Sequence, residues 1–410
     1  MASPLTRRWA YWGLIVLSAI NMLNYIDRFL APALLESIKA SELQPNDILL
    51  GLLGSGFIVI YTLAAPIFGV LGDRRSRPRW IAIGIFLWSV ATALSGMARS
   101  YLQLLISRAL VGVGEAAYGT IAPSLLADYF SKRLRGRIFA IFFCAIPVGA
   151  ALGYVFGGLL DKHFGWRAAF FVGGIPGIIL AALTLFLRDP PRGSDERDYA
   201  LPEKNKSIVE TYRGFLANSP YIWTVLGYAA YTFAIGGLSW WMPSFLERVR
   251  EIPRESATVS FGGIVVVTGL VGTFVGGWWG DHWAKTSRQA YLWLSALTMI
   301  LAAPFAFVAL SSSTPSIYYP ALFIAELLAF ISTGPINSAI VNFVAPAERA
   351  SAVALSVFSI HMFGDVWSPS IIGTISHFTS LATAVLLVPI VMALSGVLWW
   401  IAGRSADRSS

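Results

Sequence analysis

Residues 48–77, ILLGLLGSGFIVIYTLAAPIFGVLGDRRSR, contain the pattern that decides the fold. The first 25 of these residues are almost wholly apolar, and Asp73 and three arginines follow at once. A helix that crosses a bilayer needs about 20 predominantly apolar residues, and arginines beside it are typical of a cytoplasmic loop. We therefore expect a membrane-spanning helix over 48–72 that ends in a cytoplasmic loop.

Eleven further apolar runs of spanning length cover most of the remaining chain. They lie at residues 10–34, 79–98, 101–128, 135–160, 167–187, 220–246, 256–280, 289–310, 316–342, 350–376 and 381–402. The composition agrees, because 56% of the 410 residues are hydrophobic and 13% are charged, whereas soluble domains carry about 25% charged residues. The predicted fold class is an all-α membrane protein with twelve transmembrane helices.

A polar stretch divides these runs into two groups of six. Residues 188–219 contain Pro190, Pro191, six basic and six acidic residues. Pro and charge are typical of a linker, and its 208–216 portion could form a short surface helix. The predicted organisation is an N-terminal six-helix bundle over 1–187, a cytoplasmic linker over 188–219 and a C-terminal six-helix bundle over 220–410.

The positive charge of the chain indicates its orientation. Although the net charge is +8, the basic residues lie in short clusters between apolar runs, which favours a membrane surface over nucleic acid as partner. Assigning alternate loops to opposite sides places 21 of the 30 Lys and Arg residues on the side of both termini and seven on the other. We expect a multi-pass protein of the cell membrane, the inner membrane in a bacterium, with both termini cytoplasmic.

The two halves resemble each other in sequence. GVLGDR at 69–74 is matched by GWWGDH at 277–282, 208 residues later, and LRG at 134–136 corresponds to ERA at 348–350, 214 residues later. Both matches agree with the six-plus-six hydropathy pattern. Transporters built from repeated halves place their binding cavity between the repeats near the bilayer midplane, so we expect such a cavity here.

Four ionisable residues lie inside predicted spans of the first half. Asp27 and Arg28 are in the first span, and Arg108 and Glu115 are in the fourth. Residue counting puts Asp27 level with Arg108, and the spacing of seven puts Arg108 and Glu115 on one helix face. Charges in a bilayer are costly, which makes each of them a candidate functional group.

These residues have two interpretations. A carboxylate beside an arginine is ionised, and the same group alone in an apolar cavity takes up a proton, so making and breaking the contact would couple a proton to a solute. The alternative is a static salt bridge that fixes helix packing. Arg28 either extends to the interface or holds a phosphate or carboxylate of the substrate.

The second half has its own polar set. Glu326 lies in the tenth span, level with Asp365 of the eleventh, and His361 shares a helix face with Asp365. A second proton site, a polar substrate contact and a structural cluster are all open interpretations. Aromatic side chains complete the expected lining of the cavity. The predicted cavity residues are Asn24, Tyr25, Tyr118, Phe143, Tyr231, Trp240, Glu326, His361 and Asp365.

The loop after the second span resembles the loop motif of the major facilitator superfamily, from which it departs at Ser76, where glycine is usual. An aspartate at a helix end can lie against the N-terminus of a neighbouring helix, among arginines that hold a cytoplasmic gate. The alternative is a solvated basic loop. The predicted gate residues are Gly69, Asp73, Arg74, Arg77 and, in the second copy, Asp281.

Three further motifs resemble the spinster branch of that superfamily: RALVGVGEAAYGTIAPSLLADYF at 108–130, NYIDR at 24–28 and IPVG at 146–149. The resemblance covers nearly the whole chain. It implies a proton-linked or facilitated carrier of amphiphilic, lipid-like solutes of the sphingolipid or lysophospholipid class. It also implies that Asp27, Arg28, Arg108 and Glu115 occupy the coupling positions.

Short loops and termini suit a bacterial member, and bacterial proteins of the wider superfamily often carry small organic anions such as sugar acids. A proton-coupled symporter of such anions is therefore the alternative function.

An intramembrane enzyme is the remote alternative. The four histidines, His163, His282, His361 and His377, have no metal-binding spacing, and the chain has no Gly-x-Ser-x-Gly motif and no glycine-rich phosphate loop. We expect no catalytic residue, no metal and no cofactor. The expected protein is a monomer whose partners are its solute, protons and the lipid bilayer.

Overall fold

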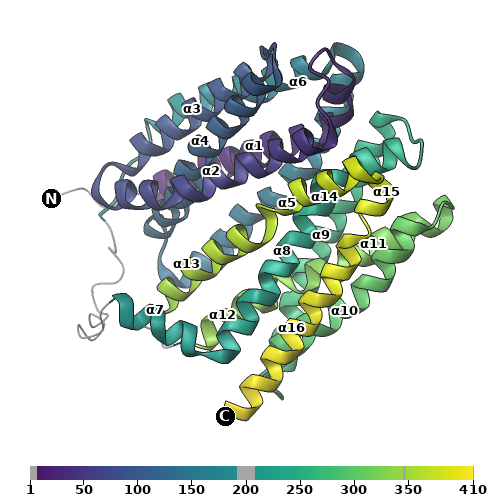
Figure 1. The fold of residues 1–410 in the computed structure, drawn as a ribbon. Coiled ribbons are helices and arrows are strands. Elements are labelled where there is room, and N and C mark those ends of the chain that lie inside the picture. Colours follow the sequence, from purple (N-terminus) through teal and green to yellow (C-terminus); the bar gives the residue numbers. More distant parts are fainter. Residues whose placement is uncertain (1–6, 192–207, 345–347, 410) are drawn as a thin grey trace. The chain divides into compact units, whose positions relative to one another are not determined.

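The computed structural model describes residues 7–191, 208–344 and 348–409, most of which lie in helices (Figure 1). In the first half, the helices are α1 (Arg7–Ala40), α2 (Asp47–Arg74), α3 (Arg77–Gly96), α4 (Tyr101–Tyr129), α5 (Lys132–Phe164) and α6 (Trp166–Thr184). In the second half, they are α7 (Ile208–Ala217), α8 (Ser219–Arg248), α9 (Arg254–Ala284), α10 (Ala290–Ser311), α11 (Pro315–Ile331), α12 (Thr333–Asn342), α13 (Arg349–Ile360), η2 (His361–Asp365), α14 (Ser368–Phe378), α15 (Leu381–Ala384) and α16 (Leu387–Ser409). The predicted all-α membrane fold class is confirmed.

Eleven spans in the described part of the chain are long and apolar enough to cross a bilayer. The predicted span at 350–376 is helical too, but it consists of three pieces: α13, the π-helical turn η2 and α14. A Cβ at Gly364 would meet Thr232 and would lie 2.6 Å from the carbonyl oxygen of Ala229, so η2 approaches α8 closely. Single π-helical turns of this kind are frequent at functional sites.

The helices gather into two compact units. Unit 1 comprises residues 1–46, 52–200 and 252–262, and unit 2 comprises 47–51, 201–251 and 263–410. Helix α2 therefore begins in unit 2, and α9 begins in unit 1. The contiguous halves predicted from the sequence, 1–187 and 220–410, stay a prediction, and residues 192–207 of the predicted linker lie outside the described residues.

In unit 1, α1 packs along α5, and α3 packs against α4 and α6. Glycines on α5 set the distance to α1: a Cβ at Gly149 would lie 2.6 Å from the carbonyl oxygen of Met22, and one at Gly153 would lie 2.6 Å from that of Ile26. Close backbone approach of this kind holds transmembrane helices together. It fixes the segment of α1 that carries Asp27 and Arg28.

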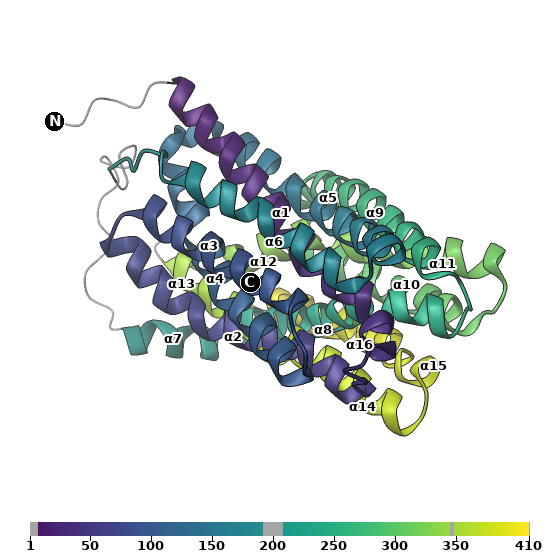
Figure 2. The same cartoon turned by 90° about the horizontal axis from the view of Figure 1, so that it is seen from above.

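In unit 2, α8 packs against α16 and η2, and α10 packs against α16 and α11; Figure 2 shows α10 beside α11. Helix α7 occupies the segment for which the sequence suggests a short surface helix. Its Phe215 is buried in a cluster with Tyr221 and Ile340, whereas Leu216 is exposed. The side chain of Asn218 accepts a hydrogen bond from the backbone N–H of Tyr221, which caps the start of α8.

Candidate functional site

The first buried ion pair of unit 1 joins Asp27 of α1 to Arg108 of α4. Both residues are at most 1% exposed. Arg108 Nη1 donates to Asp27 Oδ1 over 3.3 Å, and the hydroxyl of Thr92 on α3 donates to Asp27 Oδ2 over 2.6 Å. The carboxylate therefore ties three helices together, at the depth that residue counting predicts for Asp27 and Arg108.

The second ion pair joins Arg28 of α1 to Glu115 of α4. Arg28 donates from Nη2 over 2.7 Å and from Nε over 3.1 Å, and both hydrogen bonds go to Glu115 Oε2. Glu115 is fully buried, whereas 24% of the Arg28 side chain is exposed. Within the described residues, Glu115 Oε1 is buried without a hydrogen-bond partner. The two pairs thus differ, because the second has an accessible arginine and an unused carboxylate oxygen.

Aromatic rings surround the guanidinium of Arg28. Its central carbon lies 5.1 Å from the ring centroids of Tyr25, Phe57 and Tyr61. Phe57 also lies 5.7 Å from the guanidinium carbon of Arg108. A cation over a ring face is stabilised by the negative potential of that face, and more so where water is excluded. Arg28 therefore remains stabilised as a cation when its contact with Glu115 changes.

A cavity of about 100 Å³ opens beside Arg28. Its wall combines polar and aromatic groups, all from unit 1. The lining residues are Asn21, Asn24, Tyr25, Arg28, Tyr61, Tyr118, Gly119, Pro123, Phe142, Phe143 and Ile146. The Asn24 side-chain nitrogen is buried and has no acceptor among the described residues. The cavity thus presents one cation and a spare hydrogen-bond donor, which suits a small anionic head group.

The predicted cavity residues Asn24, Tyr25, Tyr118 and Phe143 all line this space. Their clustering follows from α1, α4 and α5 packing together, which the motifs at 24–28, 108–130 and 146–149 do not reveal individually. The Arg28–Glu115 contact was missed by sequence reasoning, which placed Glu115 near Arg108. Residue counting gives depth in the membrane but not the rotation of one helix toward another.

The predicted residues of unit 2 are dispersed. His361 Nδ1 lies 3.0 Å from Asp365 Oδ1 within η2, and Tyr231 shares a hydrogen bond of 3.1 Å with the hydroxyl of Thr333. Trp240 is buried and donates from Nε1 to a backbone carbonyl. Glu326 is buried on α11, and no ion pair joins it to Asp365 in the described part of unit 2. These residues therefore form no single constellation there.

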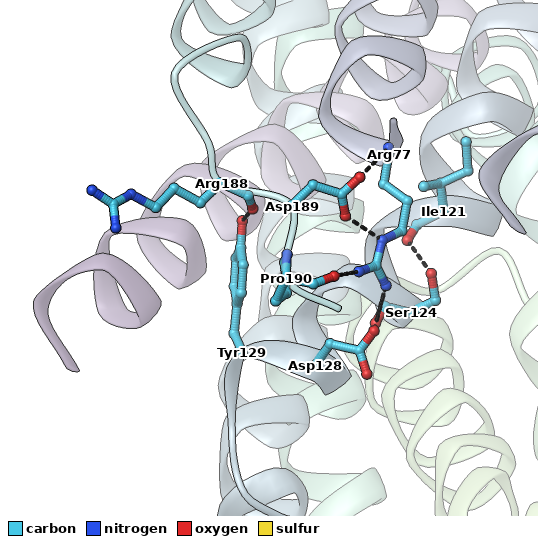
Figure 3. A network of polar contacts seen from close by, with 8 residues as sticks. All are labelled: Arg77, Ile121, Ser124, Asp128, Tyr129, Arg188, Asp189 and Pro190. Carbon is cyan, nitrogen blue, oxygen red and sulfur yellow. Dashed lines mark hydrogen bonds and ion pairs between the residues drawn. The ribbon is translucent and has the colours of Figure 1, made fainter. Parts of the chain in front are cut away.

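Arg77, at the start of α3, is the centre of a second polar network (Figure 3). Nε donates to Asp189 Oδ1 over 2.8 Å, Nη1 to Asp128 Oδ2 over 2.5 Å and Nη2 to the Pro190 carbonyl over 2.7 Å. The backbone N–H of Arg77 donates to Asp189 Oδ2 over 3.0 Å. Nearby, the Tyr129 hydroxyl donates to the carbonyl of Arg188 over 2.7 Å. The network ties the start of α3 and the end of α4 to the segment after α6.

Of the predicted gate residues, Arg77 is the one that the structure places in this network. Asp73 and Arg74 are exposed, and a Cβ at Gly69 would meet nothing within 4 Å. Asp281 accepts a hydrogen bond of 2.8 Å from the Tyr291 hydroxyl. Sequence reasoning missed Asp128 and Asp189; the signal for Asp189 is its position directly before Pro190 and Pro191, where the chain leaves the last helix of the first half.

Comparison with known proteins gives a consistent result. The family model described as Major Facilitator Superfamily matches residues 17–364. "Protein spinster homolog 1" of Xenopus tropicalis is 35% identical over 379 residues, which are 88% of this chain and 72% of that protein. "Sphingosine-1-phosphate transporter SPNS2" of the same species is 34% identical over 413 residues, 93% of this chain and 79% of the relative.

Among solved structures, a bacterial homolog of the human lysosomal transporter spinster, in an inward-facing and unoccupied conformation, superposes with a TM-score of 0.88. The superposition covers 98% of both chains at 22% sequence identity. At this identity the likeness concerns the fold alone.

Proposed function

This chain belongs to the spinster family of the major facilitator superfamily, and on that premise we propose that it is a proton-coupled carrier of amphiphilic, lipid-like anions. Its relatives are membrane transporters and not enzymes. The observation that carries the proposal is the occurrence of two ion pairs, Asp27–Arg108 and Arg28–Glu115, inside the transmembrane helices of unit 1. Ionisable side chains are energetically costly inside a bilayer, and they are retained there where a transported ion or substrate uses them.

The two pairs support different roles. Asp27 is sealed by Arg108 and Thr92, so its carboxylate has little reason to change protonation while α1, α3 and α4 stay packed. Glu115 accepts its hydrogen bonds from Arg28, feels Arg108 only through a weaker Coulombic attraction, and keeps one oxygen without a partner among the described residues. When Arg28 turns away, the buried Glu115 carboxylate loses its hydrogen-bonded counter-ion and takes up a proton. We assign the exchange of the proton to Glu115.

The substrate provides the reason for Arg28 to turn away. An anionic head group in the adjoining cavity would compete with Glu115 for the same guanidinium, which is suited to phosphate and carboxylate. The cavity of about 100 Å³ has room for a head group but not for an acyl chain. The aromatic residues of its wall favour an amphiphile, and a relative in the family is named a sphingosine-1-phosphate transporter.

Orientation completes the proposal. We propose that both termini lie in the cytoplasm, a position supported by the excess of basic residues in the loops on their side. The Arg77 network would then lie at the cytoplasmic ends of α3 and α4.

The test is transport by the purified protein in proteoliposomes with an imposed pH gradient. Sphingosine 1-phosphate and lysophosphatidylcholine are compared with glucuronate, a sugar acid, each with and without the gradient. We expect gradient-dependent accumulation of the amphiphilic anion and loss of that accumulation in Glu115→Gln. Transport of glucuronate without the lipids would replace the substrate assignment by the organic-anion alternative, and accumulation that ignores the pH gradient would refute proton coupling.

A further inference from the structure

Glu326 is a buried carboxyl group that the proposed mechanism of unit 1 does not use. It lies in the second half of α11 and is 2% exposed. Its neighbours on the same helix, Leu322, Ala325 and Ala329, are equally buried and apolar. A carboxylate in such surroundings requires a counter-ion or several hydrogen bonds if it is to remain ionised.

The described part of unit 2 provides no such counter-ion. Helix α10 has Tyr291 as its one titratable residue, and α9 has none between residues 256 and 280. The interior of α8 contributes the tyrosines 221, 228 and 231, and α12 contributes no titratable residue. His361 and Asp365 of η2 pair with each other. In the described residues no ion pair reaches Glu326, in contrast with Asp27 and Glu115, which each contact an arginine.

Thr268 of α9 is the polar side chain in contact with Glu326 among the described residues. Its hydroxyl also lies 2.7 Å from the carbonyl oxygen of Ile264. One neutral hydroxyl, itself shared with the backbone, supplies no counter-charge for a buried carboxylate, so a neutral carboxylic acid fits these surroundings better than an ionised one.

The internal repeat gives Glu326 a counterpart. It follows Glu115 by 211 residues, which lies between the repeat separations of 208 and 214 found for the flanking helices. The residues at the same separations from Arg28 are 236–242, GGLSWWM, which contain no cation. The second half has thus kept the carboxyl group of the Arg28–Glu115 pair without its arginine.

We propose that Glu326 is a second proton-carrying site, held as a neutral acid in this conformation and able to release its proton when unit 2 opens to water. The step is a proton transfer from the carboxyl O–H to water, and no other bond changes. The inference rests on the proposed proton coupling for its role in transport, but the protonation itself is independent of any substrate. Each transport cycle would then involve two carboxyl groups, one in each unit.

The direct test is infrared difference spectroscopy of the reconstituted protein at neutral pH, without any substrate. We expect the carbonyl stretch of a protonated carboxylic acid in the wild type, its loss in Glu326→Gln, and its retention in Glu115→Gln. The band should also remain in the control Glu247→Gln, which changes a carboxylate at the end of α8. Thr268→Val keeps the carboxyl group and removes the polar side chain in contact with it, so it should shift the frequency of the band. A band that persists in Glu326→Gln, a wild type without a band, or an unshifted band in Thr268→Val would each overturn the assignment.

A second measurement separates this inference from the proposed function. Counting protons moved per sphingosine 1-phosphate in proteoliposomes should give one fewer for Glu326→Gln than for the wild type. An unchanged ratio would show that the proton on Glu326 does not move in the cycle. Wild-type transport without any proton movement would refute the proposed coupling, while the infrared band would still report the neutral acid.

Discussion

Replacing Asp27 by Asn tests whether the Asp27–Arg108 pair is a fixed structural contact. The substitution keeps the shape of the side chain but leaves the Arg108 guanidinium, 1% exposed, without a counter-ion. Removing one partner of a buried ion pair costs about 3–5 kcal/mol. At about 2–4 °C per kcal/mol for a unit of roughly 200 residues, the thermal midpoint should fall by on the order of 10 °C.

The matched control is Glu115→Gln. Its amide oxygen can still accept from Arg28, and that arginine keeps its three aromatic neighbours and an exposed fraction of 24%. We expect a loss of about 1 kcal/mol, the size of one hydrogen bond. Both variants are compared with the wild type by thermal unfolding in the same detergent. An Asp27→Asn midpoint equal to that of the wild type would refute the structural role of Asp27. Asp27 would then be the candidate for the carboxylate that couples proton to solute.

Four further outcomes follow from the same contacts. Glu115→Gln should flatten the dependence of accumulation on pH, as measured in proteoliposomes at acidic and neutral pH; a wild-type profile would contradict it. Arg28→Ala should weaken substrate binding more than Arg28→Lys, because lysine keeps the charge and loses only the planar fork; equal KM values would count against head-group binding. Asp189→Asn should destabilise the anchor of Arg77 by about 1 kcal/mol, since the side chain is one-quarter exposed and Asp128 remains; the check is faster tryptic cleavage after Arg188. Gly364→Ala should lower the thermal midpoint through a loss of about 1–3 kcal/mol, because its Cβ would lie 2.6 Å from a backbone oxygen of α8; an unchanged midpoint would show that η2 adapts.

The hydropathy pattern was sufficient for the fold because a bilayer requires each span to satisfy its own backbone hydrogen bonds. Run length therefore predicts a helix almost directly. The exception is informative: the run at 350–376 has the length of a single span, yet it contains the π-helical turn His361–Asp365. Gly364 within this turn lies close to α8, and a single-helix pattern contains no information about a neighbouring helix.

The candidate site was predictable in part, for a related reason. An ionisable residue within an apolar run is visible in the sequence, so Asp27, Arg28, Arg108 and Glu115 could be named as a group. Depth along the helix follows from counting, and the structure indeed pairs Asp27 with Arg108. The rotation of α1 about its axis does not follow from counting, and this rotation decides that Arg28 contacts Glu115. The packing of α1 on Gly149 and Gly153 of α5 sets that rotation.

The electrostatic difference between the units bears on how a carrier of this kind completes its cycle. In unit 1 the two carboxylates are compensated by arginines, so their charge is stable as long as the pairs hold. In unit 2 no ion pair reaches the buried carboxyl of Glu326 among the described residues, and its proposed state is the neutral acid. An anionic substrate that takes Arg28 adds a negative charge, and a proton on Glu115 cancels it. Glu326, which forms no ion pair among the described residues, needs no substrate to be neutral. Under the proposed mechanism, substrate controls the protonation of Glu115, whereas access to water alone controls the protonation of Glu326.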